Sequence, residues 1–76
     1  PSTVISYSIA GPQAGQPVTL GVYNILGQEV ARLVEGPAVP GEYRVEFSAD
    51  QLASGLYFYR IQVGDLSETR KMILMK

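Results

Sequence analysis

A chain of 76 residues, with 46% apolar and 17% charged residues, fits one globular domain with one hydrophobic core and excludes a disordered chain. Seven acidic and six basic residues are scattered along it and give a formal net charge of −1, so no basic block is available to bind nucleic acid. Cysteine and histidine are both absent, which excludes disulfides, thiolate zinc sites and histidine-dependent nucleophile systems.

The chain contains no apolar run of about 18 residues that could cross a bilayer, and no charged start followed by an apolar stretch that would mark a signal peptide. It also begins without methionine. We therefore predict a single domain over residues 1–76 without a transmembrane segment, cut from a parent protein that carries any export information.

The first third of the chain alternates between apolar and polar residues, as half-buried strands do. Strands are predicted over residues 3–9 and 18–24, on either side of a loop rich in glycine and proline. The side chains expected to face the core are Ile5, Tyr7, Ile9, Val18, Leu20 and Val22. Gly27 accepts a positive φ, so residues 25–28 are predicted to form a hairpin turn into a third strand over residues 29–34.

Two prolines mark residues 36–41 as the next loop. The following strand, residues 42–48, shows the cleanest alternation, with Tyr43, Val45 and Phe47 pointing inward. Residues 49–54 are too short for an ordinary helix. We expect Asp50 to cap a single turn that places Leu52 under the sheet.

Gly55 starts the next predicted strand, residues 56–63, which a hairpin turn at residues 64–65 joins to a closing strand over residues 67–75. Short strands separated by glycine and proline at intervals of about 8 to 12 residues are typical of a sandwich or small barrel. We predict an all-β fold, an immunoglobulin-like antiparallel β-sandwich of about seven short strands, of which six are clear.

No residue pattern predicts a catalytic, cofactor or metal site. Glu42 and Glu46 share a strand face at roughly 13 Å, too far apart for a retaining glycosidase pair. Asp65 and Glu68 flank a turn and form at most a weak candidate for calcium binding. We interpret all four carboxylates as solvated surface groups.

Two aromatic residues lie on strand faces assigned outward, Tyr23 and Phe58. They are the candidates for an aromatic binding surface, such as one that stacks on sugar rings. Two other interpretations stay open: the facing of these strands is reversed, or the rings are sheltered under a loop.

The most unusual segment closes the chain and consists of Lys71, Met72, Ile73, Leu74, Met75 and Lys76. Four consecutive apolar residues cannot all be covered in a half-buried strand. Either this is a central strand buried on both faces, or one of its faces is left for a partner. The two lysines resemble the charges that protect an apolar edge from aggregation.

Five segments, in chain order, resemble the motifs of one known family. They are residues 1–7, 22–30, 40–43, 52–60 and 68–72, the second of which reads Val-Tyr-Asn-Ile-Leu-Gly-Gln-Glu-Val. The family is the carboxy-terminal sorting domain (type A) of the bacterial type IX secretion system. A related pattern occurs in the immunoglobulin-like domain of the flagellar hook-cap protein.

This resemblance implies a non-catalytic, immunoglobulin-like domain without cofactors, which directs an upstream cargo protein across the outer membrane of a Gram-negative bacterium. The implied partners are the outer-membrane translocon, a shuttle protein and a sortase. The implied location is the periplasm during transit, then the cell surface or the medium.

The family motifs map onto two groups of positions. We interpret one group as structural, and it consists of Pro40, Gly41, Tyr43, Leu52, Gly55 and Tyr57. The segment from Lys71 to Lys76 is the predicted site of partner recognition. Two alternative functions remain open: a structural spacer or assembly domain like that of the hook cap, and a carbohydrate-binding accessory module that uses Tyr23 and Phe58.

Overall fold

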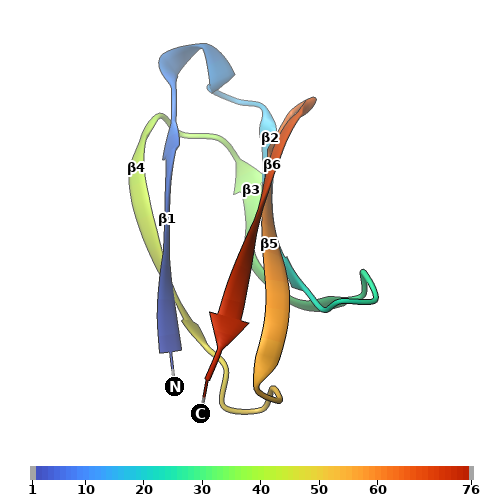
Figure 1. The fold of residues 1–76 in the computed structure, drawn as a ribbon. Helices are drawn as coiled ribbons and strands as arrows, with labels where there is room; N and C mark the ends of the chain where they lie inside the picture. The colour runs from blue at the N-terminus through green and yellow to red at the C-terminus, as the bar shows by residue number, and fades with distance from the viewer. Residues whose placement is uncertain (1, 76) are drawn as a thin grey trace.

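The computed structural model describes residues 2–75, which form six antiparallel strands and one short 3-10 helix, η1 (Gly11–Gln13). The strands are β1 (Ser2–Ile9), β2 (Pro17–Tyr23), β3 (Glu29–Pro37), β4 (Gly41–Ser48), β5 (Gly55–Val63) and β6 (Leu66–Leu74). β1 and β4 form one sheet, and the other has the order β3-β2-β5-β6 (Figure 1). The predicted all-β sandwich is confirmed, with six strands in the described residues and no seventh.

The core lies between the two sheets and is built from the predicted inward positions. Leu20 and Val22 on the central strand β2 are fully buried. The other predicted inward residues that are buried or half-buried are Ile5, Tyr7, Ile9, Val18, Tyr43, Val45 and Phe47. Because strand side chains alternate between the two faces, this inward set leaves polar residues such as Ser6 and Glu46 in solvent.

The turn between β2 and β3 is organised by Asn24. Its side-chain Oδ1 accepts hydrogen bonds from the backbone N–H groups of Leu26, at 2.9 Å, and Gln28, at 3.0 Å. Gly27 has a φ of 82°, so the predicted turn is confirmed. This hydrogen-bonded turn exposes Ile25 and Leu26.

β3 is longer than predicted, because it continues to Pro37 instead of ending at residue 34. Gly36 pairs with Val18 and Pro37 pairs with Pro17, so the predicted loop over residues 36–41 is wrong for its first two residues, and also for its last, Gly41, which begins β4. A proline is tolerated there because β3 is an edge strand, where one side of the backbone needs no ladder partner.

Residues between β4 and β5 form a turn rather than a helix, as expected for so short a segment. The Leu52 N–H donates to the carbonyl of Ala49 at 3.0 Å. Leu52 is half-buried and packs against the cluster that contains Phe47, which confirms its predicted position under the sheet.

Candidate functional site

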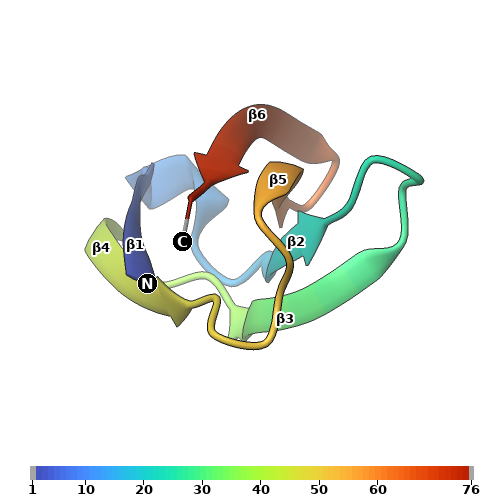
Figure 2. The same ribbon diagram turned by 60° about the horizontal axis from the view of Figure 1, so that its bottom comes forward.

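The closing strand β6 is an edge strand. It pairs with β5 from Leu66 to Leu74, and no strand of the described residues pairs with its other side. Figure 2 shows β6 at the outside of its sheet. Of the two interpretations of the closing run, the central strand buried on both faces is therefore wrong.

Side chains of the closing run divide between the core and the solvent. Leu74 is buried in the cluster that contains Phe47, and Met72 is half-buried against it. Ile73 and Met75 are 69% and 76% exposed. The two inward residues hold the strand in place, and the exposed ones remain available to a partner. The second predicted guard, Lys76, lies outside the described residues, as does Pro1 of the first family motif.

A groove of about 500 Å³ lies between β1 and β6. Its floor includes alternate residues of β5, namely Tyr59, Ile61 and Val63, because β5 presents its inner face there. Its walls contain consecutive residues, 5–8 of β1 and 66–68 of β6. Consecutive residues of a strand point to opposite faces of the sheet. A wall that includes side chains from both faces is therefore the edge of a strand. The groove is therefore flanked by two strand edges over a largely apolar floor.

The motif residues interpreted as structural occupy two similar corners that open β4 and β5. The Tyr57 hydroxyl donates to the carbonyl of Ala53, four residues upstream, at 2.8 Å. Tyr43 reaches the carbonyl of Val39 with the same spacing. In each corner a glycine precedes the tyrosine by two residues.

The glycines of these corners, Gly41 and Gly55, have φ values of 148° and 150°, which favour glycine. Pro40 lies within the first corner, between Val39 and Gly41, and is exposed. Leu52 lies just before the second. These contacts support a structural role for the motif residues.

Tyr23 and Phe58 lie side by side on the outer face of the larger sheet, as predicted, because they are register partners on β2 and β5. Both are half-buried. The Arg60 guanidinium carbon lies 4.9 Å from the centroid of the Tyr23 ring, a cation–π contact that covers one side of the ring. The ring also covers Gly21, where a Cβ atom would lie 3.0 Å from the Tyr23 hydroxyl.

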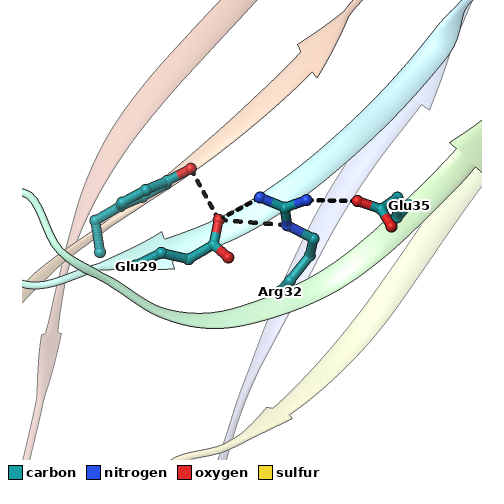
Figure 3. Close-up of polar contacts among 4 residues, drawn as sticks. Glu29, Arg32 and Glu35 are labelled. Carbon is teal, nitrogen blue, oxygen red and sulfur yellow. Dashed lines mark hydrogen bonds and ion pairs between the residues drawn. The ribbon is translucent and has the colours of Figure 1, made fainter.

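An ion-pair cluster lies on β3 and contacts Tyr23 (Figure 3). Arg32 Nη2 lies 2.9 Å from Glu29 Oε2, and its Nη1 donates to Glu35. The Tyr23 hydroxyl donates to the same Glu29 oxygen at 3.3 Å. The hydrogen bonds from Arg32, the largest cause, hold the pKa of Glu29 below its usual value.

A pH-dependent contribution to stability follows from the lowered pKa of Glu29. Its stabilising effect is present at neutral pH, above the ordinary pKa of about 4.3, and is lost as the pH falls through the lower folded-state pKa. We expect Glu29→Gln to unfold at slightly lower urea concentration than the parent at pH 7, and the difference to shrink as the pH falls through the lowered folded-state pKa of Glu29.

The matched control for Glu29 is Glu46→Gln. Glu46 is exposed, and the described residues give it no ion pair, so this variant makes the same change in formal charge without breaking one. Urea denaturation at several pH values measures the stability of both variants. A pH dependence that is equal for the two variants would contradict the assigned role of Glu29.

The structure brings together no acidic group that resembles a metal site. Among residues 2–75, no three histidine, cysteine, aspartate or glutamate side chains are grouped to hold a cation. Glu68, half of the weak calcium candidate, is hydrogen-bonded to Arg70 Nε at 2.8 Å. The same residues include no helix long and apolar enough to cross a membrane.

Comparison with known proteins identifies the family of this chain. Residues 3–75 match the family model described as the secretion system C-terminal sorting domain. Comparisons with curated proteins and with solved structures give no significant match. The family match covers nearly the whole sandwich, from β1 to the end of β6. The chain therefore belongs to the C-terminal sorting domains of the type IX secretion system, and is a non-catalytic secretion and sorting signal.

Proposed function

We propose that this domain sorts its cargo by offering the closing strand to the secretion machinery, with recognition concentrated in residues 71–76. The family implies interaction with that machinery and a cargo that is secreted or displayed at the cell surface. The partners we propose are the outer-membrane translocon, a shuttle protein and a sortase. The cargo, joined upstream, passes through the periplasm on the way.

The observation that carries this proposal is the unpaired edge of β6. An edge strand presents a row of backbone N–H and C=O groups that can pair with a strand from another protein. Such strand addition obtains affinity from main-chain hydrogen bonds and specificity from alternate side chains. The groove beside β6 leaves space for an added strand along residues 66–70.

The distribution of side chains on β6 also supports recognition at the chain end. Leu74 and Met72 fasten the strand to the core, so its edge is held in a defined position. Lys71, Ile73 and Met75 are exposed. A strand whose alternate residues are anchored loses less conformational entropy on binding than a flexible tail does.

The test is an export assay in a host with a type IX system. We expect a periplasmic reporter that carries this domain at its carboxy terminus to reach the cell surface or the medium. Deleting residues 71–76 should leave the reporter in the periplasm. Cell fractionation and protease accessibility of the reporter measure the result. Export of the deletion variant at the parental level, or no export of the intact fusion, would refute the proposal.

Deletion of this segment also removes the buried Leu74, so it can unfold the domain. Lys71→Ala and Lys76→Ala are gentler variants. Lys71 is exposed, and substitutions of exposed residues normally change stability by less than about 0.5 kcal/mol. We expect reduced export from lysine variants whose thermal melts match that of the parent, which separates recognition from folding.

A further inference from the structure

The outer face of the larger sheet carries two adjoining rows of side chains that end at the free edge of β6. Register places Tyr23, Phe58 and Lys71 side by side in one row. Leu56 and Ile73 form the neighbouring row, and they are 39% and 69% exposed. A strand added to β6 would extend both rows by one residue each.

Cations on this face differ in how they are neutralised. Arg32 is paired with Glu29 and Glu35. In contrast, neither Arg60 nor Lys71 has a carboxylate partner within residues 2–75; Arg60 contacts the hydroxyl of Thr69 and the Tyr23 ring. The face next to the β6 edge is therefore apolar with uncompensated positive charge.

From this arrangement we infer that the partner strand has a fixed pattern: an acidic side chain beside Lys71 and, two residues away, an apolar side chain beside Ile73. The inference rests on the proposed strand addition at β6 and specifies its register. Opposite charges and apolar pairs directly across neighbouring strands are mutually stabilising, whereas a shift by one residue would turn both side chains to the other face.

The residue between these two positions in the partner strand would point to the inner side of the sheet, beside Met72. Met72 packs against the buried cluster that contains Phe47 and Leu74. An apolar side chain fits beside it, so the complete pattern is an acidic outward residue, an apolar inward residue and an apolar outward residue. This is the pattern of a half-buried strand, which favours a polypeptide as the occupant.

Two other kinds of occupant fit the face less well. A sugar ring needs a free aromatic face, and Arg60 covers one side of Tyr23. A lipid surface would use the apolar and cationic side chains but not the unpaired backbone edge of β6. A strand of a protein uses both the side chains and the edge.

The test compares export rates of reporter fusions in pulse-chase experiments. Reversal of one cross-strand charge pair corresponds to about a 2- to 30-fold change in affinity, so we expect Lys71→Glu to slow export by a factor in that range and Lys71→Arg to preserve it. Ile73→Ser should slow export about tenfold or more, because it removes apolar contact area. Thermal melts of the purified variants check that each is folded.

Matched controls come from exposed residues elsewhere. Arg44→Glu reverses a charge on β4 of the other sheet, and Val39→Ser removes an apolar side chain that is 61% exposed in the loop before β4. We expect both to be exported at the parental rate. Slower export of the β6 variants, but not of these controls, supports the inferred pattern.

Failure of this inference differs from failure of the proposed function. If the intact fusion is exported while Lys71→Glu and Ile73→Ser keep the parental rate, sorting holds and the inferred pattern is wrong. If the intact fusion stays in the periplasm, the proposed function itself fails. Binding of the purified domain to phosphatidylglycerol vesicles that Ile73→Ser abolishes would assign the face to lipid and overturn the inference.

Discussion

Replacing Phe47 by alanine is expected to lower the free energy of unfolding by about 3 to 5 kcal/mol. Phe47 is 5% exposed and belongs to a buried cluster with Val22, Tyr57 and Leu74, which come from the opposite sheet. Removal of its ring leaves a cavity between the sheets. A domain of this length has a total stability of about 4 to 11 kcal/mol, so the variant should lose a large part of it.

Urea denaturation followed by circular dichroism measures this loss. The matched control is Phe58→Ala, which removes the same side chain from the half-buried outer face and should cost less. If Phe47→Ala unfolds at the same urea concentration as the parent, the packing of Phe47 on β4 against the larger sheet has been assigned wrongly.

The second large effect is expected at Gly55. Its φ of 150° lies where side chains other than hydrogen are rarely accommodated, so Gly55→Ala should cost about 1 to 3 kcal/mol. No atom lies within 4 Å of a Cβ built at this position, apart from the glycine and its chain neighbours. The cost therefore comes from the backbone conformation rather than from a clash. The altered backbone would also disturb the hydrogen bond from Tyr57 to Ala53.

Gly11→Ala is the control for Gly55→Ala. A Cβ at Gly11 also meets no atom within 4 Å, but its φ lies outside the range that L side chains rarely adopt. Alanine there should be neutral or stabilising by up to about 1 kcal/mol, since it restricts the unfolded chain. Equal unfolding midpoints for the two variants would show that the Gly55 corner is not required.

Strand positions could be predicted because alternation is a local signal. The inward residues of β1, β2 and β4 follow from apolar residues two positions apart, and the structure buries or half-buries them. The end of β3 could not be found in this way. Gly36 and Pro37 belong to a strand only because Val18 and Pro17 lie opposite them, and the amino-acid types alone favour a loop.

Small buried residues gave no local signal either. Ala38 and Ala49 lie outside the predicted strands, yet they are 4% and 0% exposed. Ala49 packs in the cluster of Phe47, and Ala38 in the cluster of Ile9 and Val18. Their burial depends on loops that fold back over the ends of the sandwich. Alanine is common both in cores and on surfaces, so its type does not distinguish the two.

The sequence by itself determined that the closing run is too apolar for an ordinary half-buried strand, and that sorting is the function its motifs indicate. It left open whether this strand is central or at an edge, and sheet order decided that question. Strand order depends on pairing between residues far apart in the chain, such as Leu20 with both Val34 and Ile61. A period of two shows which face of a strand is buried, but not which strand lies beside it, so the free edge of β6 and the groove next to it emerge only when the two sheets pack together.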